Sequence, residues 1–140
     1  MSLANHNAVM EALKTSLANF VPGRTVTRTL IDPANAKTQE LKSGVFCLVV
    51  EGGGNFADYV GRAADLGEMT VRVVGFVQVA EKATPADVET AELAMLGDLL
   101  RWINAGGVAG LDTVSAGNWT CSKQLEHPFG WLVLELKVKT

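Results

Sequence analysis

The sequence predicts an α+β domain in which two helices pack against a mainly antiparallel sheet of about five strands. Two segments repeat apolar residues at every third or fourth position, which is the period of a helix. Other segments alternate apolar and polar residues or form short β-branched runs, which are typical of strands. The order is helix, three strands, helix, two strands, and strands separated by only two helices favour this class of fold.

The first helix is expected over about residues 5–20. Val9, Leu13 and Leu17 share one apolar stripe there, and an asparagine at position 5 or 7 is suited to capping its start. The Pro-Gly pair at positions 22 and 23 marks its end.

Three strands are expected next, at residues 24–31, 44–51 and 68–80. The second is apolar on both sides of the pleat and predicts a central strand that is covered on both faces. Apolar and polar residues alternate along the third, which places Met69, Val71, Val73, Val77 and Val79 on one face. We expect long loops at 32–43 and 52–66. If the three strands form a meander, the two loops leave opposite ends of the sheet.

The second helix is expected from Thr84 to about Asn104. Thr84 is suited to capping it, Pro85 to its first position and Asp87 to a bond back to the cap. A broad apolar face should pack across the sheet. The residues predicted for its outer face are Glu89, Glu92 and Asp98.

Two final strands are expected at 114–125 and 131–139, joined as a hairpin by a turn at His127–Gly130. Apolar and polar residues alternate regularly in the last strand. In the strand before it, Trp119 and Cys121 fall on one face, and we interpret them as core residues.

The composition excludes several classes of function. The formal net charge is −3 and the pI about 5.3, whereas nucleic-acid-binding domains usually carry a basic stripe or a pI above about 9. Apolar runs such as Val45–Val50 are far shorter than the roughly 20 residues of a membrane span. We therefore expect one domain over residues 1–140, with no membrane and no sequence-specific nucleic acid among its partners.

The cysteines and histidines give no sign of a chemical site. Cys47 and Cys121 lie far apart, and the first eight residues contain no signal peptide, so two buried thiols in a reducing cytoplasm are expected. His6 and His127 lack metal-ligand spacing, and no cofactor is expected. The three glycines at 52–54 follow a strand but lack the residues of a phosphate-binding loop, so we favour a flexible loop over an anion site.

The two long loops carry the candidate interaction residues, because loops of this length in a small domain are uncommon unless they are functional or disordered. Aromatic residues in the second loop suit interface anchors, although they could instead fold back over their own core. Its charges are interpreted as solvated rather than as an acid–base pair. The candidates are Lys37, Gln39 and Lys42 in the first loop, and Gly53, Phe56, Asp58, Tyr59 and Arg62 in the second.

The order, length and character of these elements resemble a known family over the whole chain. They run from the opening helix Asn5-His6-Asn7-Ala8-Val9-Met10-Glu11-Ala12-Leu13 to the closing strand Gly130-Trp131-Leu132-Val133-Leu134-Glu135. In these respects the chain is similar to the phage tail terminator, or minor tail protein U-like, proteins of long-tailed phages and prophages. Those proteins are small α+β subunits that assemble as hexameric rings.

The resemblance implies a structural role without catalysis. Such a ring would cap the tail tube protein, end its polymerisation and offer a joining surface to the head–tail connector protein, with the long loops making these contacts. It would reside in the bacterial host cytoplasm during assembly and then in the virion tail. Two alternatives remain: a small enzyme or ligand-binding domain with a pocket under the 52–66 loop, using residues such as Asp58, Tyr59, Arg62 or His127, and a peptide-binding adaptor.

Overall fold

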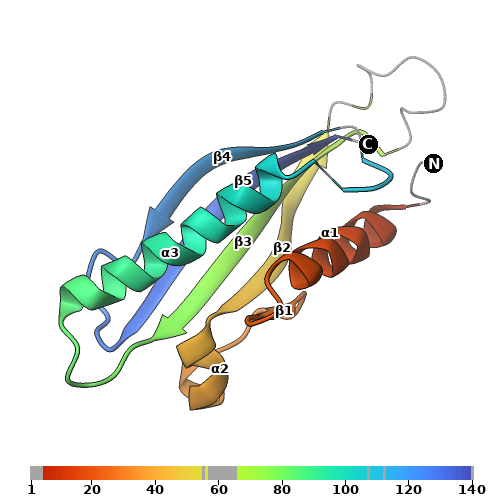
Figure 1. Ribbon diagram of the computed structural model, residues 1–140. Coiled ribbons are helices and arrows are strands. Elements are labelled where there is room, and N and C mark those ends of the chain that lie inside the picture. Colours follow the sequence, from red (N-terminus) through yellow and green to blue (C-terminus); the bar gives the residue numbers. More distant parts are fainter. Residues whose placement is uncertain (1–4, 55, 57–65, 107, 112, 140) are drawn as a thin grey trace.

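The computed structural model describes residues 5–54, 56, 66–106, 108–111 and 113–139. In these residues it has an α+β fold with a mixed, mostly antiparallel sheet of five strands, which confirms the predicted class (Figure 1). The elements are α1 (His6–Phe20), β1 (Thr25–Thr27), a 3₁₀ helix (Pro33–Asn35), α2 (Thr38–Ser43), β2 (Val45–Gly54), β3 (Glu68–Gln78), α3 (Pro85–Asn104), β4 (Thr113–Cys121) and β5 (Phe129–Lys139).

The strands lie in the order β1-β2-β3-β5-β4. β1 pairs with β2 in parallel, while every other neighbouring pair is antiparallel. The first three strands are therefore not a meander, because a parallel neighbour requires a crossover connection. The strand predicted at 24–31 is also shorter than expected, since the chain turns away after Thr27 into this crossover.

The segment 32–43, predicted as an extended loop, contains the 3₁₀ helix and α2. Asp32 caps the 3₁₀ helix by accepting a hydrogen bond from the Ala34 backbone N–H at 3.0 Å. Leu41 of α2 is buried in a small cluster with Val45 and Cys47. The burial of this one leucine against the sheet explains why a polar segment becomes ordered there.

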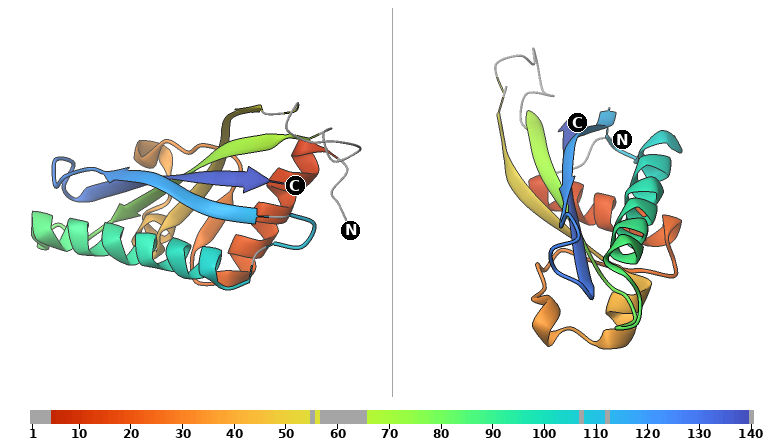
Figure 2. Two further views of the ribbon diagram at one scale, coloured as in Figure 1. Left: turned by 90° about the horizontal axis from the view of Figure 1, so that it is seen from above. Right: turned by 90° about the vertical axis from the view of Figure 1, so that its left-hand side faces the viewer.

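The main core lies between the sheet and the two long helices, α1 and α3, which cover the same face of the sheet (Figure 2). The predicted stripe of α1 is confirmed, because Val9, Leu13 and Leu17 are fully buried. Alternate residues of β3 and β5 supply the other side of this core. We call the opposite side of the sheet the open face, since in the described structure only α2 packs on it, at one end.

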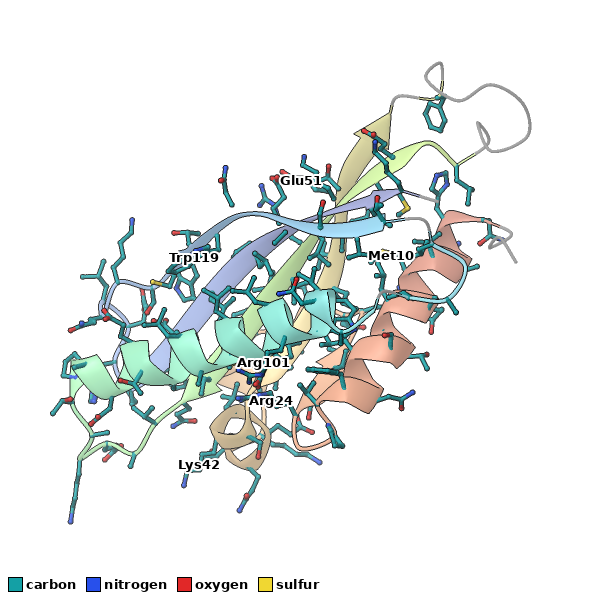
Figure 3. The ribbon with its side chains drawn as sticks, turned by 45° about the horizontal axis from the view of Figure 1, so that its top comes forward. Met10, Arg24, Lys42, Glu51, Arg101 and Trp119 are labelled. Carbon is teal, nitrogen blue, oxygen red and sulfur yellow. The ribbon has the colours of Figure 1, made fainter. Side chains whose placement is uncertain are left out.

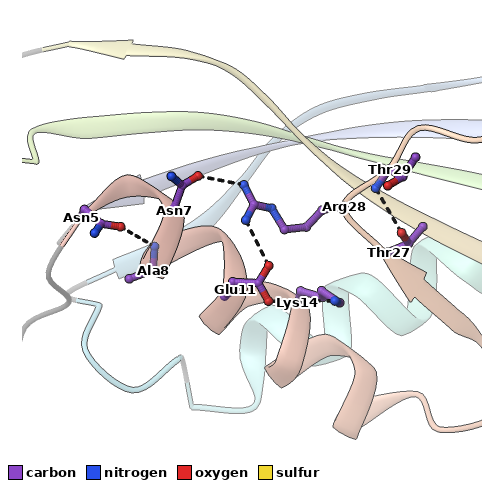
Figure 4. Close-up of polar contacts among 8 residues, drawn as sticks. All are labelled: Asn5, Asn7, Ala8, Glu11, Lys14, Thr27, Arg28 and Thr29. Atoms are coloured by element: carbon purple, nitrogen blue, oxygen red, sulfur yellow. Dashed lines mark hydrogen bonds and ion pairs between the residues drawn. The ribbon is translucent and has the colours of Figure 1, made fainter.

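Polar contacts fix the start of α1 and join it to the segment after β1 (Figure 4). Asn5, one of the two predicted caps, accepts a hydrogen bond from the Ala8 backbone N–H at 2.8 Å. Arg28 donates to the Glu11 carboxylate at 3.0 Å and to the Asn7 side-chain oxygen at 3.2 Å. These contacts place the crossover that leads to α2 beside the helix.

The predicted capping of α3 is confirmed. The Asp87 backbone N–H donates to the Thr84 hydroxyl at 3.2 Å, and the Asp87 carboxylate accepts from the Thr84 backbone N–H at 2.8 Å. The outer-face prediction is wrong for Glu92, which is 1% exposed, and for Asp98, which pairs with Arg24 at 2.8 Å. Polar groups from other elements bind Oε2 of Glu92 and one oxygen of Asp98, which explains why these carboxylates turn away from solvent.

Trp119 of β4 is 48% exposed, so the interpretation of this residue as core is wrong. It stands opposite Leu134 of β5, but β4 is an edge strand with a neighbouring strand on one side only. The prediction of two buried thiols fails in part for the same reason. Cys47 in β2 is fully buried, whereas Cys121 at the end of β4 is partly exposed.

This difference predicts unequal reactivity of the two thiols. Burial raises the pKa of the Cys47 thiol, and a backbone hydrogen bond at Ile31 only partly offsets that rise. Since the thiolate is the reactive form, we expect Cys121 to react with an aromatic disulfide reagent in the native protein and Cys47 to react only after unfolding. Titration in buffer and in denaturant checks this, and rapid native reaction of both thiols would contradict it.

Candidate interaction site

The candidate residues of the first loop lie at one end of the molecule. Lys37, Gln39 and Lys42 are all exposed, on α2 or just before it. Lys42 points away from the sheet, and Figure 3 places it at the opposite end of the molecule from Glu51. β2 starts beside α2, and its ten residues extend roughly 30 Å towards the other end.

The candidates of the second segment lie at that other end or outside the described residues. Gly53 is exposed near the end of β2. Phe56 is 51% exposed, and its ring lies so close to Gly67 that a Cβ there would come within 2.9 Å of it. Half of the Phe56 side chain therefore remains accessible while the other half packs on its own chain. Asp58, Tyr59 and Arg62 lie outside the residues that the structure describes.

The glycines at 52–54 continue β2, contrary to the prediction of a flexible loop. The pairing with β3 shifts between Val50 and Gly52 and then resumes up to Gly54. A Cβ on Gly53 would lie 2.2 Å from the Glu68 carbonyl oxygen, so only glycine fits at this approach of the two backbones. The Gly53 position is thus explained by strand pairing.

A groove on the open face lies beside these glycines. It has a volume of about 580 Å³ and is formed by the ends of β2, β3, β4 and β5. We call it the charged groove, after its lining side chains: Glu51, Glu68, Thr70, Glu135, Lys137 and Lys139.

Ion pairs lie at and beside the charged groove, two between neighbouring strands and one within β5. Arg72 donates to Glu51 at 2.6 Å, Lys137 lies 3.3 Å from Glu135, and Lys139 lies 3.0 Å from Glu68. The hydrogen bond to Arg72 lowers the pKa of Glu51, and the same bond raises the pKa of Arg72. Acidic and basic groups thus compensate one another here, so the charged groove has little net charge with which to attract a small charged ligand.

Of the residues proposed for an enzymatic site, His127 is the one that lies among the described residues. His127 precedes β5, whose first residue pairs with the last residue of β3, so it lies at the opposite end of the sheet from the charged groove. Its Nε2 lies 2.5 Å from the Ala83 carbonyl oxygen. Within the described ranges, no group of three or more His, Cys, Asp or Glu side chains is placed to hold a metal ion.

Two strand edges are the features that sequence reasoning missed. β4 pairs with β5 on one side only, and most of its residues are exposed. β1 covers only Val45–Cys47 of β2, so in the described structure the outer edge of Leu48–Gly54 has no strand beside it. The signal for the first edge was the absence of charge from Thr113 to Cys121, which is unusual for an edge strand.

Comparison of the chain with protein-family models and with curated proteins gives no match. Among the described helices, none is both long and apolar enough to cross a membrane.

Proposed function

We propose that this chain is a structural subunit of a long-tailed phage or prophage tail, without catalytic activity. Copies of it would form a ring, a hexamer by the resemblance noted above, that caps the tail tube protein and ends its polymerisation. The ring would also present the surface that joins the head–tail connector protein. Assembly would take place in the bacterial host cytoplasm, and the subunit would remain in the virion tail.

The observation that carries this proposal is a sheet with two different open edges. In the described structure, the β4 edge and the Leu48–Gly54 edge lie on opposite sides of the sheet. Two different edges on one subunit suit head-to-tail association, which closes into a ring when the rotation between copies allows it. The order of the elements, which follows the predicted one with α2 added, supports the same proposal.

Accessible side chains at both ends of the sheet also support it. Lys37, Gln39 and Lys42 are exposed beside the start of β2, while Phe56 is half exposed beyond its end. A ring with its axis along the strands would direct these two groups towards opposite rims. One rim would then contact the tube and the other the connector.

The test is the capping of tail tubes. Tube protein that polymerises in the presence of this chain should give short tubes with a ring at one end, visible by electron microscopy. Native mass spectrometry at tens of micromolar, with and without tubes, gives the number of copies. Normal tube growth with no bound ring would overturn the proposal.

The charged groove favours a second candidate, a ligand-binding domain, because a 580 Å³ hollow beside a glycine-rich strand end is within the size range of small-molecule sites. A thermal-shift screen of small molecules discriminates the two. A ligand that raises the melting temperature of the wild-type chain but not of an Arg72→Ala variant would support binding at this face.

A further inference from the structure

The two open edges lie in the same half of the sheet. The pairings Gly54–Glu68, Glu68–Lys139 and Lys139–Thr113 form one row across four strands. The pairings Leu48–Val73, Val73–Leu134 and Leu134–Trp119 form another. The edge of β2 from Leu48 to Gly54 and the edge of β4 from Trp119 to Thr113 therefore span the same rows.

The directions of the two edges also match. β2, β3, β5 and β4 are antiparallel in succession, so β4 runs opposite to β2. If a second copy stands beside the first in the same orientation, its β2 edge is antiparallel to the β4 edge of the first. Antiparallel strands can then form the regular ladder of backbone hydrogen bonds without any offset along the strands.

We propose that β4 of one copy pairs with Leu48–Gly54 of β2 in the next copy, so that the sheet continues from subunit to subunit. The inference builds on the proposed ring and names the surface that would close it. The matching rows place Trp119 opposite Leu48, Ser115 opposite Gly52 and Thr113 opposite Gly54 of the next copy. Each strand has one register shift between these rows, Val50/Gly52 in β2 and Ala116/Trp119 in β4, and the two shifts offset each other, so these three pairs fit one ladder.

The side chains on the two edges fit such pairing. Residues 113–121 contain no charged residue and no proline, two of the usual devices that keep edge strands apart, and of the third, a bulge, β4 has one between Ala116 and Trp119, offset by the one in β2. The charged residue of β2, Glu51, is already paired with Arg72. Val50 and Trp119 are 46% and 48% exposed, and a neighbouring strand would cover part of both.

The glycines of β2 leave room for the neighbouring strand. A Cβ on Gly52 or Gly54 would meet no atom within 4 Å, so the space over the ends of these rows is open. The facing residues Ser115 and Thr113 have small side chains. Side chains of the two strands therefore do not obstruct the approach of their backbones at Gly52 and Gly54.

Disulfide cross-linking tests the register. The full chain carries Gly52→Cys and Ser115→Cys in a Cys121→Ser background, and Gly52→Cys fits because the space there is open. Each copy then has one thiol on each edge, so mild oxidation of assembled rings should give a ladder of covalent oligomers on non-reducing gels. Copies that carry only one of the two substitutions, when mixed, should give covalent dimers and nothing larger.

The native Cys121 provides the matched control. It lies on the same strand, six residues from Ser115 and about 20 Å along the edge. A chain with Gly52→Cys and the native Cys121, but with Ser115 unchanged, should therefore not cross-link between copies. Equal cross-linking through Cys121 would show that the copies meet in no defined register, and would overturn the inference.

A second pair of variants tests the edge without new thiols. Val50→Lys places a charge on the β2 edge, whereas Leu93→Lys places one on α3 at a leucine of similar exposure, 44%. We expect Val50→Lys to raise the protein concentration at which half of the copies are assembled at least about tenfold, because pairing would bury an unpaired charge. Leu93→Lys should leave this concentration unchanged. Both should keep the melting temperature of the isolated subunit.

The outcomes separate this inference from the proposed function. Tube capping without the Gly52–Ser115 cross-link, or with Val50→Lys as competent as wild type, would overturn the strand pairing and leave the tail function standing. Cross-linked oligomers that fail to cap tubes would support the pairing and overturn the function. Cross-linking together with capping supports both.

Discussion

Replacement of Trp102 by alanine should lower the free energy of unfolding by about 3–5 kcal/mol, the usual range for the loss of a large buried aromatic side chain. Trp102 is 4% exposed and lies in the main core on α3. Its indole Nε1–H donates to the Ser16 hydroxyl of α1 at 3.0 Å. The substitution therefore removes both core volume and a direct link between the two long helices. Urea denaturation followed by circular dichroism measures the loss.

Trp119→Ala is the matched control, because Trp119 is the same residue type but 48% exposed. We expect this variant to lose about 1 kcal/mol or less in the isolated subunit, as is usual for surface positions. Trp102→Phe should fall between the two, since it keeps most of the ring and loses the hydrogen bond, about 1 kcal/mol. Equal losses for Trp102→Ala and Trp119→Ala would contradict the burial of Trp102 in the main core.

Local patterns were enough to predict the elements that alternate or cap regularly. β3 and β5 bury every second residue, as their alternation predicted, and Thr84 and Asp87 form the predicted capping box. These features depend on neighbours in the sequence, so the sequence contains the information that they require.

The features that were predicted wrongly depend on distant partners. Glu92 looks like an outer residue of a helix, and its burial depends on donors of β5 and of the turn before it, the Trp131 N–H and the N–H and hydroxyl of Ser122. Leu41 lies in a polar segment and is ordered by contact with β2. Trp119 has core character, but its strand lies at the edge of the sheet. Strand order is a tertiary property that periodicity does not encode.

The candidate interaction site was predictable only in part. The exposed positions of Lys37, Gln39, Lys42, Gly53 and Phe56 agree with their selection as surface residues. The pairing of strand edges needs the strand order and the register, and neither was accessible to sequence reasoning. The absence of charge in residues 113–121 was visible, but its meaning depends on knowing that this strand is an edge.

Replacement of Glu92 by alanine should cost about 3 kcal/mol or more of unfolding free energy. Glu92 Oε2 accepts hydrogen bonds from the Trp131 backbone N–H at 2.8 Å, the Ser122 backbone N–H at 3.3 Å and the Ser122 hydroxyl at 2.5 Å. Without the carboxylate the Trp131 N–H and the Ser122 hydroxyl lose this acceptor, and each such group costs about 1–3 kcal/mol, whereas the Ser122 N–H still donates to the Trp131 carbonyl at 3.0 Å. Glu89→Ala is the control, because it removes a partly exposed carboxylate one turn earlier on the same helix, whose hydrogen bond is with the Gln124 side chain at 2.8 Å, and it should cost about 1 kcal/mol or less.

Glu92→Gln separates hydrogen bonding from charge. The amide oxygen can replace Oε2 as the acceptor, while the amide nitrogen takes the place of Oε1, which is buried and has no partner among the described residues. If the three donors determine the stability, Glu92→Gln should retain most of what Glu92→Ala loses. Because these donors lie at the turn between β4 and β5, Glu92→Ala should also speed amide hydrogen exchange in β4 more than in β3. Equal acceleration of amide exchange in all strands would instead show that Glu92 stabilises the whole domain and not β4 in particular.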